Sequence, residues 1–307
     1  MNKDLTDDPI DPKLPRGRPT RNSYLEAGKN PFAEQFGDLS ATDWEARLAA
    51  SIGQRVVDGV TFPEFPTDDV QMGMHGTVSR QSVTGAMNYY RAIVAHAESG
   101  GSPITGNCRL LDFGTGWGRM LRPFMRDLPL ENLYGVEPNP WFCMLARGLN
   151  PYVNLIKSEY GPPLPIRSGF FNAVTAWSVF SHLGEKMARA WLHEFHRVCA
   201  PGARLYLTTW GERFFQLLED ARNRRAAGHS IHFYHGIVLD ALGGDTATPL
   251  AAYRKGEFVF VPSQGTDTYG ETWISPACME KLIPLGMRLV AHDVTSLSQD
   301  MFVIERV

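Results

Sequence analysis

A carboxylate and three glycines stand together in residues 109–119, which read Arg-Leu-Leu-Asp-Phe-Gly-Thr-Gly-Trp-Gly-Arg. An apolar stretch ends at Asp112, a glycine-rich turn follows, and Met120, Leu121 and Phe124 predict a helix after it. Glycines keep Cβ atoms out of the way, so a ligand can approach backbone N–H groups and the N-terminus of a helix. A strand, a glycine turn and a helix in this order predict a nucleotide-like ligand.

The spacing of the glycines distinguishes this turn from the dinucleotide fingerprint Gly-x-Gly-x-x-Gly, whose third glycine would fall on Arg119. Here the order is Asp-x-Gly-x-Gly-x-Gly, which resembles the first motif of the class I S-adenosylmethionine-dependent methyltransferases. The resemblance implies that S-adenosylmethionine is the cofactor, that the loop wraps its methionine part, and that Asp112 positions its amino-acid end. The loop residues implied are Gly114, Thr115, Gly116, Trp117 and Gly118.

A second carboxylate, Glu137, comes 25 residues after Asp112, at the end of an apolar run. An acid at this range can accept hydrogen bonds from ribose hydroxyls, and the resemblance assigns that role to Glu137 beside Pro138. The alternative is a surface acid before a proline turn. After a third expected strand, 152–156, the resemblance places the adenine beside Ser158 and Glu159. Related sequences often carry Asp or Asn there, so this contact stays open.

Two further strand-and-helix units follow the same pattern. The run 169–179 predicts a fourth strand, and the segment that begins with Trp177 and Ser178 resembles the family's fourth motif, which implies cofactor contacts for both. A helix that Pro201 and Gly202 end, followed by a strand, resembles the fifth unit. We therefore expect an α/β fold with a seven-stranded, mostly parallel Rossmann-like sheet, helices on both faces and an antiparallel last strand.

The chain is expected to have three parts. Residues 1–40 are polar and rich in Pro, Asp, Arg and Asn, which predicts a flexible N-terminal arm unless it docks on the core or on another subunit. Residues 41–100 predict helices over 43–57 and 79–97 that form an N-terminal lid, with Tyr90 as a cofactor contact or, alternatively, a core residue. Residues 101–307 form the methyltransferase domain that the resemblance implies.

Residues 211–275 are too long for a simple connection after the fifth strand. They predict a helix, 212–225, and a hairpin, 256–261 with 269–274, placed where ligands bind in open α/β sheets, so we expect a substrate-pocket insertion. His232 and His235 lie in it. No Asp, Glu or Cys is interleaved with these histidines, and methyl transfer from a sulfonium needs no metal, so we predict no metal site.

Catalysis of methyl transfer mainly requires that the acceptor is held in line and that water is excluded. A hydroxyl acceptor also needs a base, for which His182 is the first candidate and His232 and His235 the second. The alternative for His182 is a helix-start residue that bonds a loop. An amine acceptor needs no dedicated base. We expect methylation of a hydroxyl or amine on a small molecule, either a secondary metabolite or a sugar.

Composition excludes several function classes. A net charge of −3 over 307 residues gives no pull toward nucleic acid or membrane, and no apolar run approaches the ~20 residues of a membrane span. The first residues lack the apolar centre of a signal peptide, so the cytoplasm is expected. Four scattered cysteines suggest neither disulfides nor zinc. A homo-oligomer stays open. The alternatives are an NAD(P)-dependent oxidoreductase, which Arg119 disfavours, and a non-catalytic cofactor-binding subunit of a larger assembly.

Overall fold

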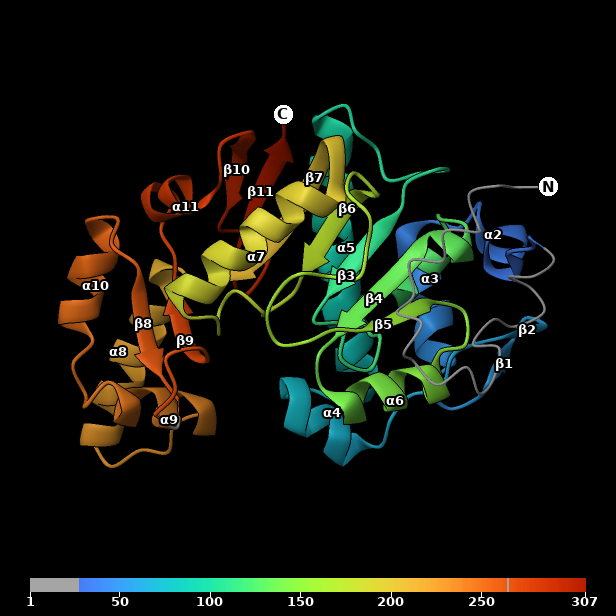
Figure 1. Ribbon diagram of the computed structural model, residues 1–307. Helices are drawn as coiled ribbons and strands as arrows, with labels where there is room; N and C mark the ends of the chain where they lie inside the picture. The colour runs from blue at the N-terminus through green and yellow to red at the C-terminus, as the bar shows by residue number, and fades with distance from the viewer. Residues whose placement is uncertain (1–27, 264) are drawn as a thin grey trace. The chain divides into compact units, whose positions relative to one another are not determined.

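The structure, a computed structural model, describes residues 28–263 and 265–307 (Figure 1). Its main feature is a seven-stranded sheet with the order β10-β11-β7-β6-β3-β4-β5. Strand β3 pairs in parallel with β4 and β6, and β4 pairs in parallel with β5. Strand β11 is antiparallel to both β7 and β10. The predicted α/β fold, with a mostly parallel sheet and an antiparallel last strand, is confirmed. The bounds are β3 Leu110–Phe113, β4 Leu133–Glu137, β5 Asn154–Lys157, β6 Phe171–Ala176, β7 Cys199–Thr209, β10 Met287–Asp293 and β11 Asp300–Arg306.

The central strands are buried from end to end, and this explains their apolar sequences. Every residue of β3 and β4 is buried, because a parallel sheet covered on both faces leaves no side for water. The chain runs from β3 to β4 and β5 on one side and returns to β6 on the other. The strand order therefore reverses between β3 and β6, and at such a point the carboxyl ends of the strands form a crevice where ligands bind.

The chain divides into two compact units. The first runs up to Thr175 and includes Val198–Ala203, and the second comprises Ala176–Arg197 and Arg204–Val307. Each unit is described by itself below.

The helices of the first unit agree with the prediction in part. The predicted helix over 43–57 ends at Ala50, where a turn leads into a short hairpin, and the helix predicted over 79–97 is present as α5. A helix over 68–75 was not predicted. The bounds are α2 Pro31–Phe36, α3 Ala41–Ala50, β1 Val56–Val57, β2 Val60–Thr61, α4 Asp68–His75, α5 Ser79–Ser99, η2 Arg122–Met125, η3 Leu130–Asn132 and α6 Pro140–Leu149.

The predicted flexible arm, 1–40, is described only in its last part, because residues 1–27 lie outside the described residues. From Asn30 onward the chain is docked on the core, which is the exception that the prediction allowed. Asn30 caps α2 and donates through its side chain to the backbone oxygens of Met125 and Leu128. Phe32 and Phe36, spaced by one helical turn, are buried against Trp44. These two aromatic side chains supply enough apolar surface to anchor a short segment.

The helix expected directly after the glycine turn does not form. Residues 116–121 are turns, and only a short 3₁₀ segment, η2, follows. Pro123 is the physical reason, because its ring lacks an N–H and clashes with the carbonyl one helical turn earlier. The glycine turn is therefore followed by a compact turn structure and not by the N-terminus of an α-helix.

The second unit contains the insertion 211–275. Its helix over 212–225 and its hairpin were predicted and are present as α8 and as β8 paired with β9, whereas α9 and α10 were not predicted. The insertion has a core of its own in which Phe214, Phe215 and Leu218 pack with Trp273. The bounds are α7 Glu185–Val198, α8 Glu212–Ala226, α9 Phe233–Ala241, α10 Ala247–Arg254, β8 Val259–Pro262, β9 Gly270–Trp273 and α11 Pro276–Leu282. In the described part of the chain, no helix is long and apolar enough to cross a membrane.

Candidate active site

The glycine turn is held against the end of β4 by backbone hydrogen bonds. The N–H groups of Gly114 and Thr115 both donate to the backbone oxygen of Val136, at 2.9 and 3.0 Å. Gly116 has a φ of +55°, which side chains disfavour, and a Cβ added to it would lie 2.5 Å from the methyl group of Met74 on α4. The lack of a side chain at Gly116 therefore allows both this turn and the close approach of α4.

Asp112 is a buried carboxylate at the end of β3, with 2% of its surface exposed. Its Oδ1 accepts a hydrogen bond from Thr175 Oγ1 at 3.0 Å, while its buried Oδ2 has no hydrogen-bond partner among the described residues. Burial raises the pKa of Asp112 to about 7, although the hydrogen bond from Thr175 and the charge of Arg119 oppose the shift. Burial also lowers the pKa of Arg119 to about 10. A buried carboxylate and a buried guanidinium thus lie close enough to influence each other.

Glu137 joins the end of β4 to the glycine turn. Its Oε2 accepts from the N–H of Gly116 and its Oε1 from the N–H of Asn139, both at 2.9 Å. Burial raises its pKa, and these two backbone donors partly oppose the rise. Glu137 is only 7% exposed, so the alternative of a surface acid before the Pro138 turn is wrong.

The two candidates after β5 differ in their surroundings. Ser158 is buried, its N–H donates to the backbone oxygen of Glu137, and its buried Oγ has no hydrogen-bond partner among the described residues. The side chain of Glu159 is 87% exposed and lies 3.9 Å from Lys157. Ser158 therefore offers an unused polar atom at the same sheet edge as Asp112 and Glu137, whereas Glu159 is turned to solvent.

Trp117 is fixed in the turn by aromatic and polar contacts. Its Nε1 donates to Nε2 of His75 at 3.3 Å, and the Nδ1 of His75 bonds Thr77 Oγ1 at 2.9 Å. An indole nitrogen only donates, so His75 must be neutral, with its proton on Nδ1. Burial and the charge of Arg119 lower the pKa of His75 to about 3, which agrees with the neutral form. Helix α4 therefore contacts the glycine turn through His75 as well as Met74.

Tyr90 takes the core position that the alternative interpretation expects, and its role as a cofactor contact stays a prediction. Its hydroxyl donates to Asp127 Oδ2 at 2.7 Å and accepts from Arg126 Nη2 at 2.9 Å, and its ring packs on Phe124. Burial and the neighbouring Asp127 raise the pKa of the hydroxyl. Both polar functions of Tyr90 are used to anchor α5 to the segment around η2.

In the second unit, the backbone at the end of β6 makes a strained turn. Ser178 has a φ of +56°, a conformation that non-glycine residues adopt rarely and mostly at functional sites. Its N–H donates to Thr208 Oγ1 at 2.7 Å, and its Oγ accepts from Gln299 Nε2 at 2.8 Å. Ser181 adds a further hydroxyl contact at 3.1 Å. The half-buried Trp177 precedes this turn. A polar network thus fixes Ser178, and sequence reasoning missed its other three members, Thr208, Ser181 and Gln299.

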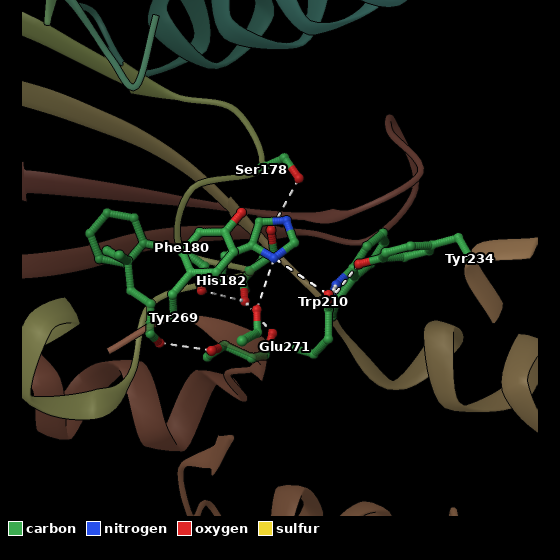
Figure 2. Close-up of polar contacts among 12 residues, drawn as sticks. Ser178, Phe180, His182, Trp210, Tyr234, Tyr269 and Glu271 are labelled. Atoms are coloured by element: carbon green, nitrogen blue, oxygen red, sulfur yellow. Dashed lines mark hydrogen bonds and ion pairs between the residues drawn. The ribbon is translucent and has the colours of Figure 1, made fainter. Parts of the chain in front are cut away.

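His182 lies beside strand β9 of the insertion. Its Nδ1 is 2.9 Å from the backbone oxygen of Gly270 and 3.6 Å from Glu271 Oε1, and its ring stacks on Tyr269 (Figure 2). A carbonyl oxygen only accepts, so Nδ1 carries the proton and Nε2 has the free lone pair. The backbone N–H of Gly270 donates in turn to the backbone oxygen of His182 at 2.8 Å. His182 is thus held in the tautomer in which Nε2 is a base.

Glu271 is the centre of this cluster, and sequence reasoning missed it. Its Oε2 accepts from Trp210 Nε1 and from the hydroxyl of Tyr234, and Figure 2 shows these two side chains reaching it from the side opposite His182. Burial and the charge of Glu271 raise the pKa of Tyr234, so its hydroxyl stays protonated. The only sequence signal for Glu271 is an acid in an otherwise uncharged hairpin strand, Gly270–Trp273.

His232 and His235, the secondary base candidates, make different contacts from His182. His232 is exposed at the start of α9, and its ring centroid lies 5.0 Å from that of His235. His235 packs edge-on against Phe214, and burial, followed by the charge of His232, lowers its pKa. Among the described residues, neither ring bonds Glu271, whereas His182 lies 3.6 Å from it, and this difference favours His182 as the base. In residues 28–263 and 265–307, no group of three or more His, Cys, Asp or Glu side chains could hold a metal ion.

A comparison with protein families bears directly on this site. The family model described as a methyltransferase domain matches residues 83–242, which is more than half of the 307 residues. The chain belongs to this family. It is an S-adenosylmethionine-dependent methyltransferase of class I. The matched segment contains the glycine turn, Asp112, Glu137 and His182, and the oxidoreductase alternative is thereby excluded. No curated protein matches the sequence significantly.

Solved structures resemble the methyltransferase distantly. CalS10, an amino pentose methyltransferase from Micromonospora echinaspora, is 18% identical with a TM-score of 0.45, over 79% of this chain and 98% of that one. DesVI from Streptomyces venezuelae is 14% identical with a TM-score of 0.48, over 79% and 100%. Magnesium protoporphyrin IX methyltransferase from Synechocystis PCC 6803 is 14% identical with a TM-score of 0.47, over 78% and 94%. Likenesses of this size do not identify an acceptor.

The residues of the methyltransferase fit its cofactor on structural grounds. Three buried polar atoms without a partner among the described residues gather where β3 and β5 end, namely Asp112 Oδ2, Thr115 Oγ1 and Ser158 Oγ. Unsatisfied buried polar groups are costly, and a bound ligand can supply the missing hydrogen bonds. A nucleoside joined to an amino acid offers the donors and acceptors that these atoms lack.

Proposed function

We propose that this methyltransferase transfers the methyl group to a hydroxyl or an amine of a small molecule, either a secondary metabolite or a sugar. When bound, S-adenosylmethionine would supply a sulfonium methyl group, and the acceptor oxygen or nitrogen would take this methyl group in line while S-adenosylhomocysteine leaves. The observation that carries the proposal is the fixed tautomer of His182, which leaves Nε2 free as a base. A free imidazole nitrogen is what a hydroxyl acceptor requires near neutral pH.

The proposed binding of the methyl donor, S-adenosylmethionine, rests on two charged side chains in the first unit. An amino acid carries an ammonium and a carboxylate, and the buried pair Asp112 and Arg119 offers one group of each opposite sign. We assign Asp112 to the ammonium and Arg119 to the carboxylate. Opposite charges held in a buried site bind a zwitterion more strongly than they would in water.

The nucleoside end would be held by the neighbouring strand ends. Glu137 already accepts two backbone N–H bonds, and each carboxylate oxygen can accept more than one hydrogen bond. It can therefore receive ribose hydroxyls without releasing the glycine turn. The unpartnered Oγ of Ser158 is our candidate for the adenine, whereas Glu159 is too exposed to be favoured.

Glu271 acts in this proposal as a positioning residue. It lies beside the protonated Nδ1 of His182, so its negative charge stabilises the imidazolium that forms when Nε2 takes a proton. Trp210 and Tyr234 donate to the other carboxylate oxygen and keep it in place. The same division of roles makes a histidine base effective when a carboxylate orients its far nitrogen.

An amine acceptor is the second candidate for this site. A neutral nitrogen attacks without losing its proton first, so His182 would then orient the acceptor or accept the proton afterwards. The aromatic rings of Tyr269, Trp210 and Tyr234 surround the cluster and would suit either a flat ring or the apolar face of a sugar. The pH dependence of the rate separates the two cases.

Two larger parts of the chain have roles in this proposal. Residues 41–100 would act as the lid, and the contacts of Met74 and His75 with the glycine turn support this for α4. The insertion 211–275 would build the acceptor pocket. The position of its residue Glu271 beside His182 supports this role. The mild negative charge favours a small molecule over nucleic acid as the acceptor.

The function can be tested by following the methyl group. The full chain is incubated with S-adenosylmethionine carrying a CD₃ group and a cell extract, and the extract is then separated into small-molecule, protein and nucleic-acid fractions. We expect mass spectrometry to find the label in a small molecule, and to find much less with His182→Asn. Label in the protein or nucleic-acid fraction alone would overturn the proposal.

A further inference from the structure

A cleft of about 640 Å³ opens within the second unit, and neither His182 nor Glu271 lines it. Its volume lies in the range of small-molecule binding sites. The side chains of Tyr253, Pro276 and Val294 contribute apolar surface, and Asp300 contributes a carboxylate. The cleft thus lies partly on the insertion 211–275 but away from the side chains of the His182 cluster.

Asp300 is the most deeply buried charge of the cleft, with 3% of the residue exposed. Its Oδ2 accepts from His292 Nε2 at 2.9 Å, and the imidazole is fixed by stacking on Phe302 at a centroid distance of 4.6 Å. The carboxylate sits directly against the backbone of Gly211. A Cβ added to Gly211 would lie 1.9 Å from Asp300 Oδ2, so the chain leaves room for the carboxylate by having no side chain there.

The arginines that line the cleft already have acceptors elsewhere. Arg254 forms an ion pair with Glu212, and Arg213 donates to the backbone oxygen of Leu297. In the described part of the chain, the side chain of Asp300 has one hydrogen-bond donor, His292. A buried carboxylate normally requires several donors or a countercharge. The cleft therefore lacks a donor, preferably cationic, at its base.

We propose that this cleft binds a small organic amine. Its ammonium group would donate to the carboxylate of Asp300, and its carbon skeleton would lie against Tyr253, Pro276 and Val294. A charge-assisted hydrogen bond to a buried carboxylate supplies the affinity, and the apolar walls favour an amine with a ring or a short chain. The site is separate from the His182 cluster, so its occupancy does not depend on the proposed methyl transfer.

Two probes of the same shape test the chemistry. Benzylamine and benzyl alcohol are titrated into the full chain without cofactor, at about pH 7.5 where an alkylamine is protonated, and binding is followed by calorimetry and ligand-observed NMR. We expect saturable binding of benzylamine and at least about tenfold weaker binding of benzyl alcohol. Equal affinities, or no binding of benzylamine, would overturn the proposal.

Variants locate the binding. Asp300→Asn keeps the shape of the side chain and should abolish the preference for the amine. Ala277→Phe, at an exposed position of the cleft wall, should block both probes while leaving the unfolding temperature unchanged. Glu280→Gln removes one exposed charge from the same helix and is the matched control, with no expected effect. Unchanged benzylamine binding by Asp300→Asn and Ala277→Phe would place the amine elsewhere and contradict the proposal.

Discussion

The Nδ1 atom of His182 lies 3.6 Å from Oε1 of Glu271, a residue 89 positions later in the chain. Strand β9 brings them together, because the N–H groups of Gly270 and Thr272 donate to the backbone oxygens of His182 and Ser181. The insertion after the fifth strand thus pairs with the segment after the fourth. An imidazole with a fixed tautomer and a carboxylate behind it has the parts of a proton acceptor.

Removing the charge of Glu271 tests its positioning role. For a hydroxyl acceptor, Glu271→Gln should lower kcat about 10- to 100-fold, because the imidazolium loses its stabilising charge. The affinity for S-adenosylhomocysteine should not change. Glu257→Gln, an exposed acid of the same insertion, is the control. Steady-state rates and calorimetry provide both readouts. A Glu271→Gln enzyme with full activity at every pH would show that the carboxylate only supports the hairpin.

The buried carboxylate of Asp112 should make the ligand-free protein less stable at high pH. Its pKa rises from 3.8 in the unfolded chain to about 7 in the folded one, so its favourable contribution is present below pH 3.8 and is lost as the pH rises through 7. Asp112→Asn, which never ionises, should therefore gain stability relative to the natural protein between pH 5 and 8. Urea unfolding at several pH values measures this difference. A difference that stays constant over that range would contradict the raised pKa.

Docking of the segment around Phe32 can be tested by truncating its side chain. Phe32 is fully buried and meets Phe62 and Tyr152 edge-on at about 5 Å. Phe32→Ala should lower the free energy of unfolding by about 3–5 kcal/mol, the usual cost of deleting a buried aromatic ring. Phe233→Ala, at a position that is 82% exposed, is the control and should change it by less than about 0.5 kcal/mol. Equal losses for both variants would mean that residues 30–36 do not anchor the chain.

The sequence predicts those parts of the fold and the site that depend on residues close to one another in the chain. Asp112 and Glu137 each end an apolar run, and a run of that kind becomes a buried strand wherever it lies in a parallel sheet. The glycine turn was recognisable for the same reason: the residues that its backbone conformation requires are consecutive in the sequence. The prediction of a helix after the turn was wrong because the apolar spacing of Met120, Leu121 and Phe124 indicates a helix, whereas Pro123 prevents one.

Other parts of the site depend on contacts between distant residues. Glu271 reaches His182 only because a hairpin pairs with the segment 181–184, and no pattern within either segment specifies that pairing. Tyr90 turned inward because Arg126 and Asp127 offer it a donor and an acceptor 36 and 37 positions away. Helix α4 was missed because its apolar side chains, Val70, Met72 and Met74, are few and are all exposed or partly exposed.

Equilibrium binding of S-adenosylhomocysteine tests most directly whether the cofactor binds at the glycine turn and Asp112. Calorimetry of the full chain should give saturable binding, at least about tenfold weaker binding in Asp112→Asn because the ammonium loses its charged acceptor, and no binding of NADH. An Asp112→Asn variant that binds S-adenosylhomocysteine as tightly as the natural protein, or a natural protein that binds NADH instead, would contradict it.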